Sequence, residues 1–383
     1  MKPSSYLELS ERALRKNIRF IREVIGEACI LSSVVKGNAY GHGIKEFVPL
    51  ARKCGIDHFS VFSAEEALQT RKAASDGCRV MIMGMIDNAD LEWAIDQGIE
   101  FFVFERGRLE AALEASKRVG KPARIHIELE TGMNRSGFTR KELEKVKDML
   151  LDNGGHFILE GLCTHYAGAE SIANYHRVQN QIKRFNARCR QLEAQGIVPR
   201  LRHTACSAAA MTYPRTRMDL VRIGIMQYGY WPSVETLMNY LGKKKSKEDP
   251  LDRVISWKSR VMNLKNVKAG EFIGYGTTYL AVHPMTIAII PVGYAEGYSR
   301  SLSNQGRVLI RGHRVGVIGI VNMNMLVADV TNVPDARIGD EVVLIGKQGD
   351  LAISVASFSE LSNQLNYELL TRLPSAIPRI VTN

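Results

Sequence analysis

The sequence predicts an α/β protein in which a (β/α)8 TIM-like barrel is followed by a mostly antiparallel β domain. The chain of 383 residues is too long for one ordinary hydrophobic core. Short apolar runs alternate with helical patterns between residues 28 and 229, whereas helical patterning nearly disappears beyond Pro250. We expect the barrel to occupy residues 1–235 and the β domain residues 236–383, with residues 1–10 as a candidate strand of the second domain.

Eight apolar runs of the first part have the composition of β-strands, and helical patterns separate them. The runs cover residues 30–35, 58–62, 80–83, 100–104, 124–129, 159–164, 201–205 and 219–224. The helical patterns cover residues 44–54, 64–73, 89–96, 108–119, 141–151 and 175–195. Because parallel strands need a crossover between them, this alternation predicts parallel units, and their number predicts closure into a barrel. An open doubly wound sheet is the alternative.

The second part of the chain consists mainly of strand-like runs rather than alternating strands and helices. Its strand-like runs cover residues 254–264, 286–292, 307–311, 314–320, 325–330 and 341–345, with Gly and Asn turns between them. A helical pattern returns only at residues 355–365. Strands joined by short turns predict an antiparallel sheet, and the polar stretch between Trp231 and Pro250 marks the boundary.

Composition and charge argue against several classes of protein. No segment reaches the length of a membrane span and residues 1–9 lack the pattern of an export signal, so we expect a cytoplasmic protein without a membrane partner. The 6 cysteines form no close C-x-x-C pair, which favours reduced thiols and no metal site. The net charge is +11, but the basic residues are interspersed with acidic ones, and the one tight basic run is residues 243–245. A nucleic-acid partner is therefore not expected, and attraction of anionic small molecules explains the charge equally well.

The most informative segment is the glycine-rich stretch after the first strand-like run. Residues 36–43 read Lys-Gly-Asn-Ala-Tyr-Gly-His-Gly. A lysine at the carboxyl end of a buried strand can present its amine to a pocket as a Schiff-base nucleophile. A lysine that merely extends from the strand into solvent is the alternative interpretation of Lys36.

In a barrel of this kind, chemistry gathers at the carboxyl ends of the strands. These ends carry Lys36 and Tyr40, residues 130–135, His165 and Tyr166, residues 206–208, and residues 222–225. An amine, two arginines, a histidine and a set of small hydroxyl and glycine positions would thus point into one mouth. These are the groups that a pyridoxal phosphate site needs.

Six segments, in this order along almost the whole chain, resemble the alanine racemase family of fold-type III pyridoxal-phosphate enzymes. They are residues 34–43, 131–135, 221–229, 274–279 and 290–295, and the final set of Tyr367, Glu368 and residues 377–380. The resemblance implies that Lys36 holds pyridoxal 5'-phosphate covalently and serves as one base at the substrate's α-carbon. It also implies that Tyr275 is the second base, supplied to the opposite face by the partner subunit of a homodimer. Without the resemblance, Tyr275 is an ordinary β-sheet aromatic.

The resemblance assigns Arg222 to the ring nitrogen of the cofactor. A guanidinium does not readily give up its proton, so it can only donate a hydrogen bond there and leaves the nitrogen unprotonated. This weakens the ring as an electron acceptor and disfavours transamination and decarboxylation. The alternative, a surface salt bridge, fits poorly because Arg222 lies inside an apolar run.

The remaining roles also come from the resemblance. The expected phosphate ligands are Tyr40, Ser207, Gly224, Ile225 and Tyr367, although Ser207 also fits a helix N-cap. Arg135 is expected to contact the cofactor's phenolic oxygen and the substrate carboxylate, and Tyr294 and Met323 to narrow the substrate mouth. His165 is expected to bind Arg222 or Tyr275, or to be an ordinary core histidine.

The chain departs from the family pattern at several positions. Gly37 stands where alanine is more usual, Cys206 where asparagine is usual, and Asn322 and Asn324 flank Met323 where the family commonly has Cys and Asp. Glu128 stands where many members carry a carbamylated lysine, and our hypothesis is that its carboxylate pairs directly with Arg135.

The resemblance implies interconversion of L-alanine and D-alanine by two bases, supplying D-alanine for peptidoglycan. A racemase of broader range or with a preference for serine is the alternative within the family. A decarboxylase of related fold fits less well, because Arg222 rather than a carboxylate would meet the ring nitrogen. A cofactor-binding protein without activity is disfavoured by a second domain that carries Tyr275.

Overall fold

The computed structural model describes residues 3–75, 77–362 and 366–383, and at residues 359–362, 366 and 367 it describes the backbone alone. The chain divides into two compact units. The barrel unit consists of Ala13–Lys36 and Val48–Asp252, and the sheet unit consists of the described parts of Met1–Arg12, Gly37–Phe47 and Arg253–Asn383.

The barrel unit is built on an 8-stranded parallel sheet in the order β8-β7-β6-β5-β4-β3-β2-β9. Its strands are β2 (Ile30–Val34), β3 (His58–Ser63), β4 (Arg79–Met85), β5 (Glu100–Val103), β6 (Ala123–Glu128), β7 (Phe157–Cys163), β8 (Leu201–His203) and β9 (Leu220–Ile223). The Asp219 N–H donates to the Arg202 carbonyl at 3.2 Å, and the Arg222 N–H donates to the Ala205 carbonyl at 2.9 Å. These two bonds bring the ends of the sheet together, which confirms the predicted barrel.

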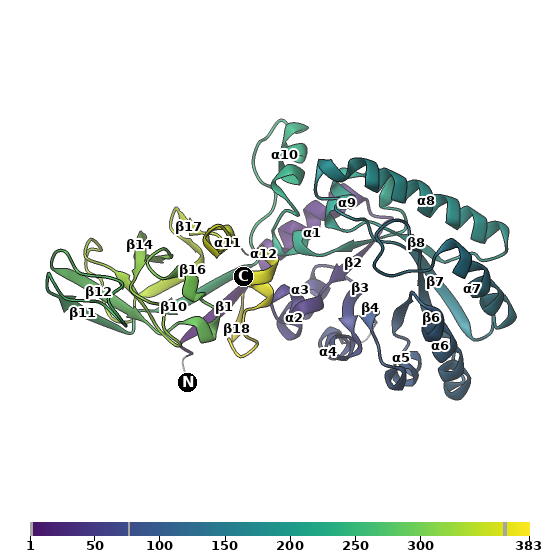
Figure 1. Ribbon diagram of the computed structural model, residues 1–383, viewed down its shortest axis with the longest axis horizontal. Coiled ribbons are helices and arrows are strands. Elements are labelled where there is room, and N and C mark those ends of the chain that lie inside the picture. Colours follow the sequence, from purple (N-terminus) through teal and green to yellow (C-terminus); the bar gives the residue numbers. More distant parts are fainter. Residues whose placement is uncertain (1–2, 76, 363–365) are drawn as a thin grey trace. The chain divides into compact units, whose positions relative to one another are not determined.

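Helices cover the outside of these strands (Figure 1). They are α1 (Glu11–Ile25), α3 (Ile44–Lys53), α4 (Ala64–Ala74), α5 (Leu91–Asp96), α6 (Arg106–Val119), α7 (Arg140–Asp152), α8 (Tyr175–Ala194) and α9 (Ser207–Thr212). A further helix, α10 (Val234–Gly242), packs against α9. Local signals define their ends, since the Glu105 carboxylate caps the first turn of α6 and Gly120 ends that helix in the left-handed conformation. Within the described residues, no helix has both the length and the apolar character that crossing a bilayer requires.

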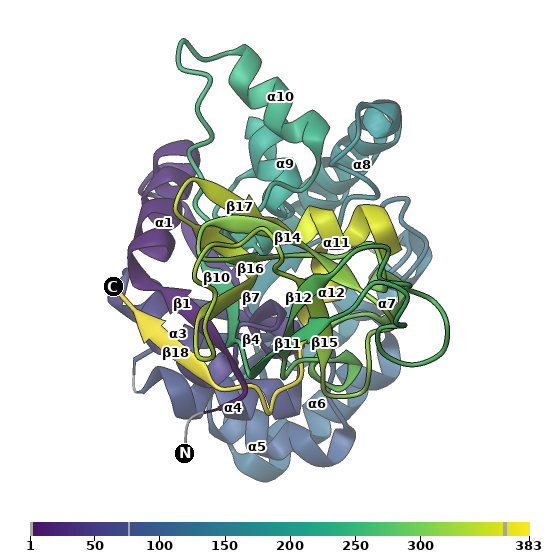
Figure 2. The same ribbon diagram turned by 90° about the vertical axis from the view of Figure 1, so that its left-hand side faces the viewer.

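The sheet unit contains a 10-stranded sheet with the path β11-β12-β15-β14-β13-β16-β10-β1-β18, and β17 pairs with β16 off this path. Its strands are β1 (Ser5–Ser10), β10 (Ile255–Arg260), β11 (Asn263–Val267), β12 (Met285–Ile290), β13 (Arg307–Ile310), β14 (His313–Ile318), β15 (Leu326–Asp329), β16 (Glu341–Gln348), β17 (Leu351–Ile353) and β18 (Arg379–Thr382). Neighbouring strands run antiparallel, except that β1 and β18 lie parallel (Figure 2). Two helices follow, α11 (Val355–Ser362) and α12 (Asn366–Thr371).

The first strand of the chain belongs to the sheet unit. β1 pairs with β10, so that Leu7 lies opposite Trp257. Leu7, Leu9 and Trp257 are all fully buried. The alternation of buried and half-buried residues in β1 is typical of a strand with one face on a core.

The segment Gly37–Phe47 also groups with the sheet unit, which differs from the expected boundary after residue 235. The reason is a close backbone approach. A Cβ atom on Gly41 would lie 1.8 Å from the Leu370 carbonyl oxygen, and the Arg379 guanidinium donates to the Gly41 carbonyl at 2.9 Å. Sequence periodicity carries no signal for such a contact, because its partners lie far apart in the chain.

This packing leads to a prediction for Gly41, which has φ of +79°. We expect Gly41→Ala to lower the free energy of unfolding by about 2–4 kcal/mol, from left-handed strain plus overlap with the Leu370 carbonyl. Gly270→Ala is the matched control, since Gly270 has φ of +86° in the same unit and nothing within 4 Å of the added atom. It should cost only about 1–2 kcal/mol. Equal losses in denaturant titrations of the two variants would contradict the proposed overlap.

Candidate active site

The mouth of the barrel brings together the lysine and the arginines predicted from the strand ends. Lys36 follows β2 directly, and β2 pairs with β9 so that Ser32 lies opposite Arg222. Partial shielding by the protein, followed by the cation of Arg135, lowers the pKa of the Lys36 amine. Burial, followed by the cation of Arg222, lowers the pKa of His165 to about 3. Lys36, Arg135, His165 and Arg222 therefore lie within electrostatic reach of one another.

Lys36 itself remains open to solvent in the single chain. The four residues after it adopt left-handed backbone angles, with φ of 63° at Gly37, 52° at Asn38, 55° at Ala39 and 51° at Tyr40. Each non-glycine residue in this region costs about 1–2 kcal/mol. A strained turn of this kind persists where the surrounding structure over-determines it, and it is a feature of functional sites.

Several hydrogen bonds hold this turn. The Gly41 N–H donates to the Gly37 carbonyl at 3.0 Å, and the Gly43 N–H donates to the Asn38 carbonyl at 2.9 Å. The Asn38 side-chain oxygen also accepts from the Ile44 N–H at 2.9 Å, where α3 begins. Tyr40 ends the left-handed stretch with a half-buried side chain.

Arg222 is 5% exposed and has four described hydrogen bonds, none of them to His165. Its Nη1 donates to Nδ1 of His203 and to the His203 carbonyl at 3.0 Å. Its Nη2 donates to the carbonyls of Thr164 at 2.8 Å and Thr204 at 3.3 Å. The expected His165 partner is thus replaced by His203. The Nε–H is the one donor of Arg222 for which the described residues supply no acceptor.

The expected phosphate ligands of the barrel unit lie together after β8 and β9. The Ser207 hydroxyl opens α9 and accepts from the Gly224 N–H at 3.0 Å. Ile225 begins the next turn, the 3-10 helix η4 (Ile225–Tyr228). The side chain of Cys206, which precedes Ser207, makes no capping hydrogen bond. The Ser207 hydroxyl at the start of α9 thus lies beside the Gly224 amide, directly before the start of η4.

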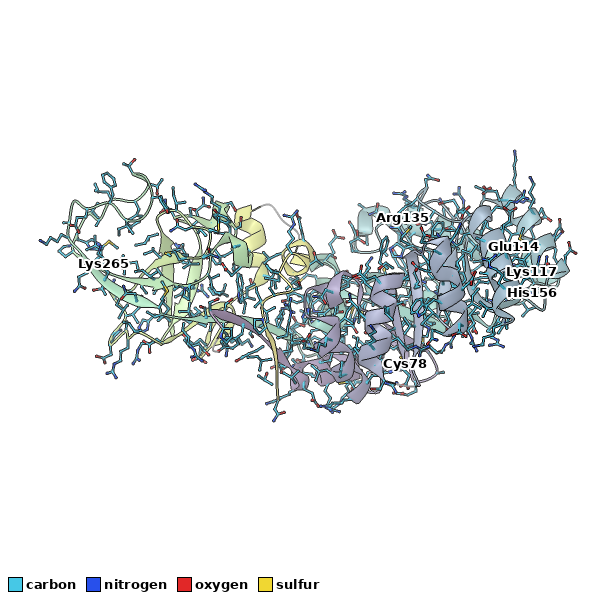
Figure 3. The ribbon with its side chains drawn as sticks, turned by 90° about the horizontal axis from the view of Figure 1, so that it is seen from below. Cys78, Glu114, Lys117, Arg135, His156 and Lys265 are labelled. Carbon is cyan, nitrogen blue, oxygen red and sulfur yellow. The ribbon has the colours of Figure 1, made fainter. Side chains whose placement is uncertain are left out.

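Glu128 does not form the expected ion pair with Arg135 among the described interactions. Its carboxylate is buried at the end of β6, and burial raises its pKa. A hydrogen bond with Ser136 and the cations of Arg222 and Arg135 partly oppose this shift. Arg135 is exposed in the turn after β6 (Figure 3). The structure therefore shows no direct ion pair between these two residues, and Arg135 acts on Glu128 only as one of the charges that lower its pKa.

Tyr275 lies at the tip of a turn between β11 and β12 in the sheet unit. Gly274 and Gly276 flank it with φ of 79° and 68°. The Ile273 N–H donates to the Tyr279 carbonyl at 3.0 Å and closes the turn below it. The side chain of Tyr275 is 71% exposed.

The structure brings Tyr294 and Met323 together within the sheet unit. The Tyr294 N–H donates to the Asn322 carbonyl at 3.0 Å, and the Ala295 N–H donates to the Met323 carbonyl at 2.9 Å. Gly293 permits this approach, since a Cβ there would lie 2.1 Å from the Asn322 carbonyl oxygen. Tyr367, also in the sheet unit, lies in α12, but its side chain falls outside the described residues.

The interior of the barrel contains buried ionisable residues that none of the sequence motifs indicated. His58, Glu100, His126 and His203 are buried inside the barrel strands. Each lies in a run that was interpreted as an apolar strand. The available signal was the ionisable residue itself, because a titratable side chain in a strand buried on both faces needs a partner.

Comparisons with known proteins agree with this arrangement. The model of the alanine racemase N-terminal domain matches residues 9–232, and that of the C-terminal domain matches residues 254–381. The alanine racemase of Leptospira interrogans (strain Fiocruz L1-130) is 34% identical over 380 residues, which cover 99% of this chain and 96% of that protein.

Two solved structures extend the likeness to three dimensions. The Bacillus anthracis alanine racemase with bound L-Ala-P has a TM-score of 0.88 at 31% identity, covering 100% of this chain and 96% of that one. The Bartonella henselae alanine racemase with covalently bound pyridoxal phosphate has a TM-score of 0.83 at 26% identity, covering 100% of both chains.

The matching family models and the full-length relatives identify the chain as an amino-acid racemase, which is an isomerase. Both family models match, and together they span most of the chain. The chain belongs to the alanine racemase family, as the motifs indicated.

The lowered pKa of Lys36 leads to a prediction on its reactivity. A lysine whose pKa is lowered loses its proton at a lower pH than an ordinary lysine, so its neutral, nucleophilic form appears earlier as the pH rises. In this experiment, cofactor-free protein is acylated competitively over a range of pH and the labelling of each lysine is measured by mass spectrometry. We expect the labelling of Lys36 to reach its half-maximum at a lower pH than that of the exposed Lys265 (Figure 3). Arg135→Gln should move the Lys36 midpoint upward. A Lys36 midpoint at or above that of Lys265 would refute the assignment.

Proposed function

We propose that this protein interconverts L-alanine and D-alanine with pyridoxal 5'-phosphate as cofactor, and so supplies D-alanine for peptidoglycan synthesis in the cytoplasm. The observation that carries this proposal is that Lys36, whose pKa is lowered, and Arg222, which can only donate hydrogen bonds, lie at the same mouth of the barrel. The relatives named above are alanine racemases, so a serine-preferring or broad-range racemase is not favoured.

The residues of the barrel mouth fit the cofactor. The Ser207 hydroxyl and the amides of Gly224 and Ile225 are donors of the kind that a phosphate needs. Tyr40 and Tyr367 would complete this phosphate site. Lys36 would hold the aldehyde carbon, and the Nε–H of Arg222 has no acceptor among the described residues. Pyridoxal phosphate, when bound, supplies a ring that accepts electron density from the substrate's α-carbon.

The chain's own groups then move the proton. Nζ of Lys36 removes or returns a proton on one face of the α-carbon, and Oη of Tyr275 does so on the other. Two bases are needed because one base cannot readily reach both faces. With the cofactor bound, Arg222 would donate to the ring nitrogen without giving up its proton, which would limit electron withdrawal and favour return of the proton to the same carbon.

The substrate contacts follow from the same assignment. Arg135 would bind the substrate carboxylate, and His165 would stay neutral at the pH of the cell because its pKa is about 3. Tyr294 and Met323 would form the mouth on the sheet side. Backbone hydrogen bonds join the two loops that carry these residues.

We propose that the protein acts as a homodimer that shares its sites. Between β11 and β12 of the sheet unit, Phe272, Tyr275, Leu280 and Val282 are exposed, and Met323 of the same unit is exposed as well. Large exposed apolar patches are typical of interaction surfaces. A second copy that covers this face would receive Tyr275 and Met323 in its own barrel mouth.

The test of the proposed reaction is a panel of L-amino acids incubated with the purified protein and pyridoxal phosphate, followed by chiral analysis. We expect D-alanine to form and to approach equal amounts of the two enantiomers. Serine conversion at a comparable rate would favour the broader racemase. Carbon dioxide release without racemisation would overturn the proposal.

Tyr275→Phe separates the second base from a packing role. Removing the hydroxyl should reduce racemisation by about 10²–10⁴-fold while the cofactor absorbance is retained. Tyr279→Phe is the matched control, because Tyr279 lies in the same turn but packs against the sheet core. If Tyr275→Phe and Tyr279→Phe lose activity equally, the assignment of the second base fails.

A further inference from the structure

A row of buried polar side chains crosses the barrel interior and ends at Arg222. Glu100 in β5 is 1% exposed, and His126 in β6 and His203 in β8 are fully buried. Inward-facing positions of a (β/α)8 barrel are normally filled by branched apolar residues. Burying a carboxylate and two imidazoles there is costly unless every group is paired.

The row is continuous. Nη1 of Arg222 contacts Nδ1 of His203, and Nε2 of His203 lies 2.9 Å from Nδ1 of His126. Nε2 of His126 lies 2.9 Å from one oxygen of Glu100, and Nε of Arg79 donates to the other oxygen at 2.6 Å. An arginine therefore stands at each end of a chain of three hydrogen-bond partners.

The two arginines set the direction of every bond between them. A guanidinium can only donate, so Nδ1 of His203 must accept and its proton must reside on Nε2. That Nε2–H donates to Nδ1 of His126, whose proton is then on Nε2 and donates to Glu100. All donors point away from Arg222, and Glu100 is the terminal acceptor.

The charge states agree with this direction. Burial, followed by the cation of Arg222, lowers the pKa of His203 well below its ordinary value, so its imidazole is neutral. Burial alone would raise the pKa of Glu100, but the hydrogen bond from His126 and the imidazole of His58, whose Nε2 lies 3.4 Å from a Glu100 oxygen, outweigh it and hold that pKa well below its ordinary value. A neutral His203 that accepts from Arg222 and an ionised Glu100 that accepts at the other end are the charge states that this direction requires.

The strand between the two histidines is adapted to their contact. Gly161 of β7 lies between β6 and β8, and a Cβ on it would be 2.4 Å from Nδ1 of His126 and 2.9 Å from Nε2 of His203. The backbone of Gly161 is not in the left-handed region, so alanine there would meet this steric overlap without added strain.

We propose that Glu100 is a positioning residue of the active site: it holds His126 and His203 in their Nε2–H tautomers and thereby orients Arg222. The four Nη donors of Arg222 are engaged by His203, Thr164 and Thr204, so the Nε–H is the donor left to face a ligand. The consequence for catalysis rests on the proposed function, in which that donor meets the cofactor's ring nitrogen.

A glutamine at position 100 cannot serve both neighbours. Arg79 needs an acceptor, so the amide oxygen would turn to Arg79 and the amide N–H to Nε2 of His126. His126 would then carry its proton on Nδ1 and donate to Nε2 of His203, whose own proton would meet the N–H of Arg222. Glu100→Gln therefore either reverses the tautomers or breaks the row.

Glu160→Gln is the matched control. Glu160 is equally buried and shares Arg79 with Glu100, but its other described partners are Arg124 and Arg200 rather than histidines. Losing this carboxylate should perturb barrel stability in the same way, because its arginines lose an acceptor. It should leave His126 and His203 unchanged.

The first measurement needs no cofactor. The ¹⁵N chemical shifts of histidine-labelled protein, assigned with His126→Gln and His203→Gln, report which ring nitrogen carries the proton. We expect Nε2–H for both His126 and His203 in the wild type, in Glu100→Asp and in Glu160→Gln. Glu100→Gln should lose this pattern, and so should Gly161→Ala.

The second measurement uses the protein loaded with pyridoxal phosphate and alanine. We expect Glu100→Gln to reduce kcat by about 10- to 100-fold with a smaller change in KM, because Arg222 is displaced relative to the reacting groups. Glu160→Gln should stay within about 3-fold of wild type, and Glu100→Asp should recover most of the loss. A shift of the cofactor absorbance in Glu100→Gln but not in Glu160→Gln is the spectroscopic counterpart.

The outcomes separate this proposal from the proposed function. An Nδ1–H tautomer at His126 or His203 in the wild type overturns the relay, and that result does not depend on the folding of Glu100→Gln. Equal effects of Glu100→Gln and Glu160→Gln on kcat and absorbance would reduce Glu100 to a structural role. If the tautomers behave as expected but the wild type does not racemise alanine, the relay stands and the proposed function fails.

Discussion

The buried guanidinium of Arg222 is the constraint on which the barrel and its site both depend. A cation in this position is tolerated only if its donors are paired, and His203, Thr164 and Thr204 supply the acceptors. The ring of Phe102 lies 6.0 Å from the guanidinium carbon and adds a favourable contact. Because β9 also joins the two ends of the parallel sheet, the arginine is placed by the same strand that closes the barrel. The strand pairing that closes the barrel therefore also fixes the position of Arg222 in the site.

The parallel register brings the second essential group to the same mouth. Ser32 of β2 lies opposite Arg222 of β9, and Lys36 follows Ser32 by four residues, just beyond the end of β2. The left-handed turn from Gly37 to Tyr40 then directs the backbone away from the strand. Its strain is sustained by hydrogen bonds within the turn and by the close approach of Gly41 to the Leu370 carbonyl. The lysine therefore sits where a regular barrel strand passes into a segment held by the other unit.

Most of the architecture could be predicted from sequence because it depends on local periodicity. Alternating apolar runs and helical patterns predicted the barrel strands, and the rule that chemistry lies at their carboxyl ends identified Lys36 and Arg222. The partners of those residues could not be predicted in the same way. His203 rather than His165 binds Arg222 because strand register and side-chain direction decide the contact, and neither is visible in a single sequence. The sequence also gives no indication of the role of Gly161, because that role depends on the positions of His126 and His203 in the neighbouring strands.

The loop that carries Met323 shows how a departure from the family pattern can be compatible with the same site. Asn324, in place of the usual aspartate, donates from its amide to a carboxylate oxygen of Glu296 at 3.0 Å. The other oxygen of Glu296 accepts from the Gly293 N–H at 2.8 Å. An aspartate at position 324 would set two carboxylates against each other, whereas the asparagine amide donates to Glu296, which joins the two loops. An acidic group is therefore still present beside Tyr294 and Met323, although a different residue supplies it. The geometry of the mouth depends on these loop contacts, so a change of side chain at position 324 need not change the substrate.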